Sequence, residues 1–491
     1  MKKLYEMTAG ELSQLIQKKE VSSFDVTKAY LDRIDDVESK VESLVTVTRE
    51  AALERAKNVD KKIASGEKVG ALAGIPYVAK DNICTKDTLT TCSSKMLYNY
   101  KPPFNATVID KLEGEDALLI AKANMDEFAM GSSTETSYFK KTKNPVNLNH
   151  VPGGSSGGSA ACVAADEAAF SLGSDTGGSI RQPASFCGVV GFKPTYGFVS
   201  RFGLVAFASS LDQIGTFTKD VTDCALALNA ITGYDVKDST SVKGYEKDFT
   251  KALGADMRGI KIGIPKEYMS DAIKPEIRET VLRAAKAYEA MGAEVSECSL
   301  PMMPYALSAY YLISSAEASS NLARYDGVRY GFRAEGCDKL ADLYFKTRSE
   351  GFGDEVKRRI MLGTFVLSSG YYDAYYKKAQ QVRTLIKQDF DKVFETYDFL
   401  ISPVSPVTAW EIGKNDMSVV ETYAADICTV SINIAGLPGM SVPCGTDAAG
   451  LPIGVQLIGK PFGDDMLIRG GYALEQSGAF PKVKALVGGA K

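Results

Sequence analysis

The chain is nearly without histidine. His150 is the only histidine among 491 residues, so a site that needs two or more histidines, for a metal ion or for proton transfer, is excluded. It stands just before a glycine-rich loop, where a histidine is more often a surface or structural residue than a catalytic one. A serine nucleophile served by a histidine placed after it is also excluded, because no histidine follows His150.

Paired cysteines, long apolar runs and a surplus of basic residues are missing as well. The nine cysteines are odd in number and never spaced as C-x-x-C, which predicts reduced, mostly buried thiols rather than disulfides or a zinc site. No apolar run approaches the roughly 18 residues of a membrane span, and the first residues lack the apolar core of a signal peptide. The net charge of −4 gives no basic footprint for holding nucleic acid without a partner. We therefore expect a cytoplasmic protein without a membrane contact.

Glycine and serine fill two segments of the chain. Residues 151–159 read Val-Pro-Gly-Gly-Ser-Ser-Gly-Gly-Ser, and residues 175–181 read Asp-Thr-Gly-Gly-Ser-Ile-Arg. Glycine has no Cβ, so such a backbone can approach another group closely; the alternative is that these glycines serve tight packing only. A flexible linker is the weaker interpretation, because a small-residue helix over 160–169 and a buried strand over 168–172 are predicted to follow at once.

A lysine is predicted at the end of a buried strand. Residues 74–83 read Gly-Ile-Pro-Tyr-Val-Ala-Lys-Asp-Asn-Ile, an apolar run that ends in polar residues. Most lysines are solvated surface charges, but Lys80 at this place is a candidate base. Alternation along the strand puts Asp81 on the opposite face, so this carboxylate need not keep the lysine protonated. Without histidine, a lysine whose pKa is lowered by burial is the remaining candidate to activate a serine.

Two other motifs are excluded. Asp175-Thr-Gly177 resembles an aspartic-protease triplet, but such a site needs two aspartates and no second triplet is present. Neither a P-loop nor G-x-G-x-x-G occurs in the glycine loop, so a nucleotide cradle is not expected in this chain.

Strands and helices alternate along the sequence, which predicts an α/β protein with a mixed, helix-covered sheet. Within one large domain we expect four parts: an N-terminal helical region over 1–70, a core over 71–232, a largely helical insertion over 233–400 and a C-terminal part over 401–491 that completes the sheet. The insertion is predicted to contain a β-α-β unit over 260–299. Residues 189–194 are expected to lead out of the core through turns.

The order and spacing of these segments resemble the amidase signature family, whose Ser-cisSer-Lys triad matches Lys80 and the segments 153–159 and 175–184. Similarity to the A subunits of glutamyl-tRNA(Gln)/aspartyl-tRNA(Asn) amidotransferases extends over 124–135, 317–330, 351–365 and 371–376. The resemblance implies the amidase signature fold, a large mixed β-sheet covered by helices on both faces. His150 replaces a more usual arginine and Thr216 a proline, and neither change touches the triad.

Transferred to this sequence, the resemblance implies three catalytic roles. Ser179 is the acyl nucleophile, Ser155 the bridging serine and Lys80 the base, with a cis peptide bond between Gly154 and Ser155. The oxyanion hole is implied to consist of backbone N–H groups of Thr176, Gly177, Gly178 and Ser179. No metal ion is implied.

The resemblance also implies a substrate and partners. Glutamine would be held by Arg359 at its α-carboxylate and Asp426 at its α-ammonium, with Tyr310 as a hydrogen-bonding wall. Its ammonia would pass through an internal channel to a B subunit that binds tRNA, ATP and magnesium, and a small C subunit would complete a heterotrimer. No cofactor is expected in this chain. The alternatives are a stand-alone amidase acting on another amide and a catalytically silent scaffold, against which the intact triad argues.

Overall fold

The apolar runs of the sequence become strands of one sheet. The computed structural model describes residues 2–245, 247–414, 423–483 and 485–487, and these form a sheet of eleven strands in the order β1-β3-β2-β4-β6-β5-β10-β11-β9-β7-β8. The strands are β1 Leu44–Val47, β2 Pro76–Lys80, β3 Leu118–Ala123, β4 Phe170–Asp175, β5 Val190–Lys193, β6 Gln213–Thr218, β7 Lys261–Pro265, β8 Glu294–Cys298, β9 Phe399–Pro403, β10 Gly439–Thr446 and β11 Pro452–Gly459. Strands β3, β2 and β4 run parallel, as do β9, β7 and β8, and the remaining pairs are antiparallel. The sheet is mixed, as predicted.

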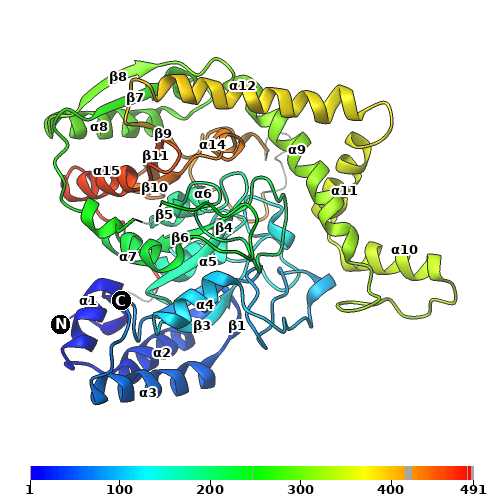
Figure 1. The fold of residues 1–491 in the computed structure, drawn as a ribbon, viewed down its shortest axis with the longest axis horizontal. Coiled ribbons are helices and arrows are strands. Elements are labelled where there is room, and N and C mark those ends of the chain that lie inside the picture. Colours follow the sequence, from blue (N-terminus) through cyan, green and yellow to red (C-terminus); the bar gives the residue numbers. More distant parts are fainter. Residues whose placement is uncertain (1, 246, 415–422, 484, 488–491) are drawn as a thin grey trace.

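Helices cover both faces of this sheet (Figure 1). They are α1 Ala9–Gln17, α2 Ser23–Val41, α3 Arg49–Ser65, α4 Thr107–Gly114, α5 Gly157–Ala164, α6 Arg181–Cys187, α7 Val221–Ile231, α8 Pro275–Ala290, α9 Ala306–Asn321, α10 Leu340–Gly351, α11 Asp354–Val366, α12 Lys378–Val393, α14 Val430–Ala435 and α15 Asp464–Gln476. Along β11 the contacts alternate, because Leu457 lies against Gly470 of α15 while Gln456 accepts a hydrogen bond from Arg181 of α6. Helices α6 and α15 therefore pack on opposite faces.

The second strand is buried at every residue. Strands β3 and β4 flank it on both sides in parallel orientation, which explains why its sequence is a continuous apolar run rather than an alternating one.

The cysteines form no disulfide bonds. All nine are free and seven are buried, as predicted.

The structure corrects several predicted elements. The expected helical region over 1–70 also contains β1, a four-residue edge strand that is too short and too exposed to show a clear period. Residues 190–193 form strand β5 rather than turns, and β6 follows it. The predicted helix over 160–169 is α5, which begins at Gly157 and ends at Ala164, and the strand predicted over 168–172 is β4, which runs to Asp175.

The segment after β8 is largely helical, as predicted. Helices α9 and α11 pack against each other, α12 packs on α9, and α10 projects from the body of the molecule (Figure 1). The predicted β-α-β unit is present as β7, α8 and β8, and it extends one edge of the sheet. Over the described residues, every helix is too short or too polar to cross a membrane.

The topology brings polar residues that are distant in the sequence together at the ends of neighbouring strands. Because β2 and β4 are parallel, Lys80 and Asp175 at their last positions lie at the same edge. Antiparallel β6 starts there, with Gln213 opposite Asp175. The loops that leave this edge contain both glycine-serine segments.

Candidate active site

Hydroxyl groups surround the amino group of Lys80, which is completely buried. Its Nζ lies 2.7 Å from Ser155 Oγ, 2.8 Å from Ser156 Oγ and 3.0 Å from Ser174 Oγ. A neutral amine has two N–H donors and one lone pair. Ser156 donates its own proton to the Ser174 carbonyl at 3.0 Å, so it accepts from the lysine, and Ser174 Oγ can accept as well. This leaves the lone pair of Lys80 for the hydroxyl of Ser155.

Burial is the main influence on the Lys80 amine. It lowers the pKa of Lys80 to about 7, against the opposing effect of the Asp126, Asp175 and Asp212 carboxylates. No ion pair with Lys80 is found among the described residues. The neighbouring Asp81 points to the opposite face, as expected, and its Oδ1 lies 3.8 Å from Lys122 Nζ. Near neutral pH a large fraction of Lys80 is therefore the neutral amine that a base requires.

The peptide bond between Gly154 and Ser155 is cis, as the resemblance implied. Gly154 N–H donates to Gln182 Oε1 at 2.9 Å, and the Ser155 carbonyl accepts from Asp126 N–H at 3.1 Å. A Cβ at position 154 would overlap the Asp126 carboxylate, so this position requires glycine. These contacts fix the direction in which the Ser155 hydroxyl points.

The second glycine segment is held by a buried ion pair. Arg181 donates to both oxygens of the Asp175 carboxylate, each at 3.0 Å, and Asn433 Nδ2 donates to Oδ1 at 2.8 Å. Burial acts to raise the pKa of Asp175, but the Arg181 guanidinium outweighs it and holds that pKa well below its usual range. The carbonyl of Ser179 accepts from Ser156 N–H at 3.2 Å, which joins the two segments. Ser179 keeps 9% exposure, whereas Lys80 and Ser155 have none, so Ser179 is the member of the triad that a ligand can reach.

Three of the four implied oxyanion donors are available in this structure. The N–H groups of Thr176, Gly177 and Ser179 have no acceptor among the described residues. The Gly178 N–H, by contrast, donates to Asp175 Oδ1 at 2.8 Å. Gly178 is therefore removed from the predicted oxyanion hole, because the loop folds back over the carboxylate at the end of β4.

Gly177 lies directly against the ring of Tyr310. A Cβ at this position would lie 2.5 Å from Tyr310 Cζ, and the Gly177 carbonyl is held by Thr429 Oγ1 at 2.6 Å. We expect Gly177→Ala to displace the free N–H groups and to lower kcat by about 10²- to 10³-fold, the loss typical of a missing oxyanion donor. Steady-state ammonia release checks this, with Gly114→Ala as control, since nothing lies within 4 Å of that Cβ. A Gly177→Ala variant with unchanged kcat would contradict this assignment.

The structure brings the predicted substrate residues together. Tyr310 and its neighbour Tyr311 lie on α9, with ring centroids 5.1 Å apart. Tyr311 donates to Asp426 Oδ2 at 2.8 Å, and Arg359 Cζ lies 4.5 Å from the Tyr311 ring. Burial raises the pKa of Asp426 to about 6, although the Tyr311 hydroxyl and Arg359 oppose it. Near pH 7 Arg359 is therefore a buried cation and Asp426 a half-buried anion.

Other residues of the site were not predicted. Ser156 and Ser174 complete the surroundings of Lys80, and Tyr311 links the two charged residues. Tyr311 directly follows Tyr310 in the sequence. This was only a weak signal, because the family resemblance assigned a role to Tyr310 alone. His150 lines a separate surface cavity with Trp410 and is not among the groups around Lys80.

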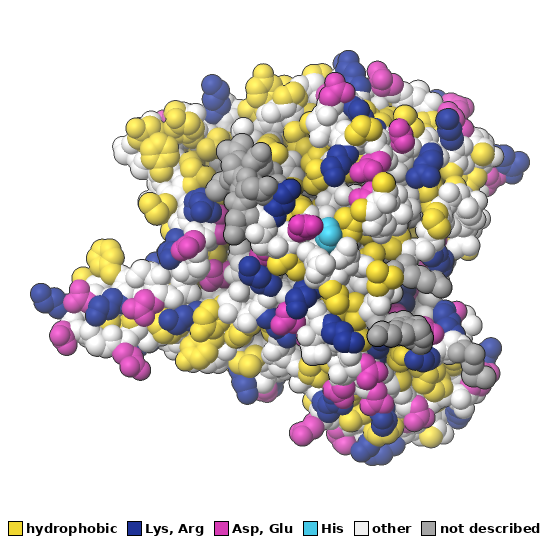
Figure 2. Space-filling view, turned by 180° about the vertical axis from the view of Figure 1, so that it is seen from behind, with side chains coloured by type: hydrophobic (Ala, Val, Ile, Leu, Met, Phe, Trp, Pro, Cys, Tyr) yellow, Lys and Arg dark blue, Asp and Glu magenta, His cyan; other side chains and the backbone are white. Residues whose placement is uncertain are grey.

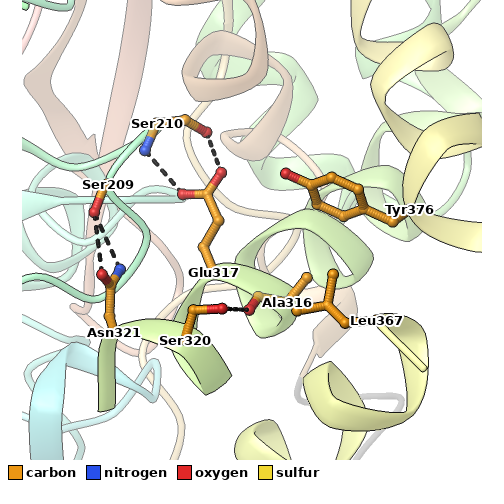
Figure 3. A pocket seen from close by; sticks show the side chains of 8 residues that line it. All are labelled: Ser209, Ser210, Ala316, Glu317, Ser320, Asn321, Leu367 and Tyr376. Atoms are coloured by element: carbon orange, nitrogen blue, oxygen red, sulfur yellow. Dashed lines mark hydrogen bonds between the residues drawn. The ribbon is translucent and has the colours of Figure 1, made fainter. Parts of the chain in front are cut away.

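A second cavity, of about 280 Å³, lies between α9 and the loop before β6 (Figure 3). It is lined by Ser209, Ser210, Ala316, Glu317, Ser320, Asn321, Leu367 and Tyr376. Glu317 accepts hydrogen bonds from both the N–H and the hydroxyl of Ser210. The catalytic residues are not part of its lining, so this cavity is distinct from the site. The loop before β6 that lines this cavity also contains Asp212. Asp212 accepts a hydrogen bond from Thr176 Oγ1 at 2.6 Å and so helps to hold the 176–179 loop in place.

A buried lysine surrounded by serine hydroxyls, at the edge of a mixed sheet, defines the class of enzyme. The sequence model of the family described as Amidase matches residues 25–468, and the chain belongs to this family. The A subunit of the glutamyl-tRNA(Gln) amidotransferase from Thermoanaerobacter pseudethanolicus is 59% identical over 488 residues, which cover 99% of this chain and 100% of the relative. The chain is therefore similar over its full length to a named A subunit.

Solved structures give the same picture. The crystal structure of the A subunit of the Thermotoga maritima glutamyl-tRNA(Gln) amidotransferase is 41% identical, with a TM-score of 0.82 and 98% of each chain covered. The peptide amidase of Stenotrophomonas maltophilia is 28% identical, with a TM-score of 0.83 and coverage of 98% of this chain and 99% of that one. The predicted amidase signature fold is confirmed.

Proposed function

We propose that this chain is the glutamine-hydrolysing A subunit of a tRNA-dependent amidotransferase. The observation that carries the proposal is that Tyr311 contacts both the buried Arg359 and the half-buried Asp426, while its neighbour Tyr310 lies against Gly177. A cation and an anion that both contact one tyrosine suit an amide that also bears a carboxylate and an ammonium group. An amide without a carboxylate would leave Arg359 Nη1 buried and without an acceptor. The full-length relatives named as A subunits support the same function.

The proposed chemistry starts from the hydrogen bond between Lys80 and Ser155. Neutral Lys80 accepts the proton of Ser155, which takes that of Ser179, while Ser179 Oγ bonds to the side-chain carboxamide carbon of glutamine. The carbonyl electron pair moves to oxygen, where the free N–H groups of the 176–179 loop stabilise the charge. Collapse of this intermediate breaks the carbon–nitrogen bond, and ammonia leaves with the relayed proton. Water then hydrolyses the γ-glutamyl ester by the same proton route, releasing glutamate and restoring Ser179.

The ammonia is supplied to a partner. In this proposal a B subunit binds the tRNA, ATP and magnesium and converts Glu-tRNA(Gln), Asp-tRNA(Asn) or both to the amides, and a C subunit completes a cytoplasmic heterotrimer. Figure 2 shows Lys and Arg side chains interspersed with Asp and Glu over one face of the molecule. This mixture supports the assignment of the tRNA to another chain, because nucleic-acid surfaces gather positive charge.

The test is ammonia release from glutamine by this chain, alone and with B and C subunits, charged tRNA and ATP. We expect release to rise with the partners and to be lost in Ser179→Ala within the same complex. Activity that is indifferent to the partners, or that is higher on some other amide, would contradict the proposal in favour of a free-standing amidase.

The base predicts the pH dependence of this reaction. Lys80 must be neutral, and burial lowers its pKa to about 7, so kcat should rise as pH increases through about 7 and should fall below it. Asp426, with a pKa of about 6, must be ionised to bind an ammonium group, so KM should rise on acidification below that value. Initial rates at pH values on both sides of these two pKa values check both limbs. A kcat that is constant across neutral pH, or that falls as pH rises through it, would contradict Lys80 as the base.

A further inference from the structure

Tyr311 touches both of the charged side chains expected to hold glutamine. Its hydroxyl donates to Asp426 Oδ2 at 2.8 Å, and Arg359 Cζ lies 4.5 Å from its ring centroid. Only 8% of Tyr311 is exposed. A rigid aromatic ring with one polar end can therefore set the separation between the two charges.

The guanidinium of Arg359 is held through its Nε, whereas its Nη1 has no partner among the described residues. Its Nε donates to Glu355 Oε1 at 2.7 Å and to Tyr423 Oη at 3.1 Å, and its Cζ lies 4.6 Å from the Tyr423 ring. Tyr311 and Tyr423 stack at 4.0 Å and 15°. Nη1 is buried and has no partner within the described part of the chain. A buried donor without an acceptor is costly, which indicates that Nη1 awaits the oxygen of a ligand.

The carboxylate of Asp426 depends on two hydroxyl groups. Oδ2 accepts from Tyr311 at 2.8 Å, and Oδ1 accepts from Ser132 at 3.2 Å. Burial raises the pKa of Asp426 and both hydroxyl donors lower it. Loss of the Tyr311 hydroxyl therefore loosens this carboxylate and favours its protonated form, while the ring that faces Arg359 remains.

We propose that Tyr311 is a positioning residue that holds Asp426 and Arg359 at a fixed separation and so makes the site selective for amides with both an α-ammonium and an α-carboxylate. This inference rests on the proposed function. It differs from a simple packing role, because it places the effect at the ammonium end of the substrate. Tyr311→Phe should change the choice between substrates rather than the rate of the chemical step.

The experiment compares glutamine with its deaminated analogue, 5-amino-5-oxopentanoate, in the full complex. With Tyr311→Phe we expect the KM for glutamine to rise about 10- to 100-fold, the loss of one hydrogen bond to a charged group, with kcat nearly unchanged. The KM for the analogue should stay the same, so the preference for glutamine falls by the same factor. Ser132→Ala should also raise the KM for glutamine and not for the analogue, by a smaller factor. This variant replaces Tyr311→Phe in the test if Tyr311→Phe fails to fold.

The matched control is Tyr288→Phe. That hydroxyl is also buried and donates to the Gly470 carbonyl at 2.9 Å in the core, so its removal should leave the preference unchanged. Equal losses on both substrates in Tyr311→Phe and in Ser132→Ala would overturn the inference and leave Tyr311 a packing residue. A wild-type complex that does not prefer glutamine over the analogue would instead overturn the proposed function itself, so the two failures are distinguishable.

Discussion

Lys80→Met is expected to lower kcat for glutamine hydrolysis by roughly 10²- to 10⁴-fold, the contribution of a positioned base. Methionine keeps much of the side-chain volume but removes the lone pair that faces Ser155 Oγ at 2.7 Å. KM should change little, because Lys80 lies among serine hydroxyls and not against Arg359 or Asp426. Single-turnover measurement of ammonia formation in the complex separates the chemical step from product release.

Two further variants make this prediction specific. Lys80→Arg keeps a cation but cannot lose its proton, so it should be about as inactive as Lys80→Met. Lys122→Met is the matched control, since Lys122 is also completely buried and donates to the Ile83 carbonyl and Thr90 Oγ1 instead of to the serine cluster. It should lower stability while kcat of the folded enzyme persists. An active Lys80→Arg would show that the base lies elsewhere.

Arg181→Met is expected to reduce the free energy of unfolding by about 3–5 kcal/mol, the cost of leaving a buried charge without its partner. Arg181 and Asp175 have no exposure, and the guanidinium also donates to Gln456 Oε1 at 2.8 Å. The ion pair anchors the loop that bears Ser179, so activity should fall with stability. Chemical denaturation with tryptophan fluorescence measures the loss.

The pH dependence of this loss follows from the low pKa of Asp175. In the native chain that pKa lies below its unfolded value, so the ion pair stabilises the fold above the unfolded pKa and is lost only as pH falls through the folded one. In Arg181→Met burial alone acts on the carboxylate and raises its pKa. The deficit should therefore shrink as acidification protonates Asp175, and Asp175→Asn should partly restore the variant at neutral pH. A deficit below about 1 kcal/mol, within the range of an exposed pair, would contradict the anchoring role.

Much of the sheet and the catalytic lysine could be predicted from the sequence, because their signals are local. A continuous apolar run marks β2, and its polar end places Lys80 at the edge of the sheet. Strand β5 was missed because its four residues, one of them glycine, carry too short a pattern to distinguish a strand from a turn. These residues form a strand because they pair with β6, which follows a long loop, and with β10, which lies far away in the sequence.

The surroundings of the catalytic groups could not be predicted, since they depend on side-chain directions across segments. Ser174 lies 94 positions after Lys80 and reaches its amine only because β2 and β4 are neighbours. The loss of Gly178 from the oxyanion hole depends on how the loop turns back toward Asp175. Tyr311 stood beside a predicted residue, and only the packing of α9 against α11 reveals that it joins the two charges.

In the proposed mechanism Ser179 forms a covalent γ-glutamyl ester with the help of Ser155 and Lys80. Rapid acid quenching of the complex with glutamine, followed by peptide mass spectrometry, detects this ester. We predict that the peptide with Ser179 gains one glutamyl group within a turnover, that Ser155→Ala slows this gain, and that Ser179→Ala abolishes it. A glutamyl group on another residue, or ammonia release at the native rate from Ser179→Ala, would contradict Ser179 as the nucleophile.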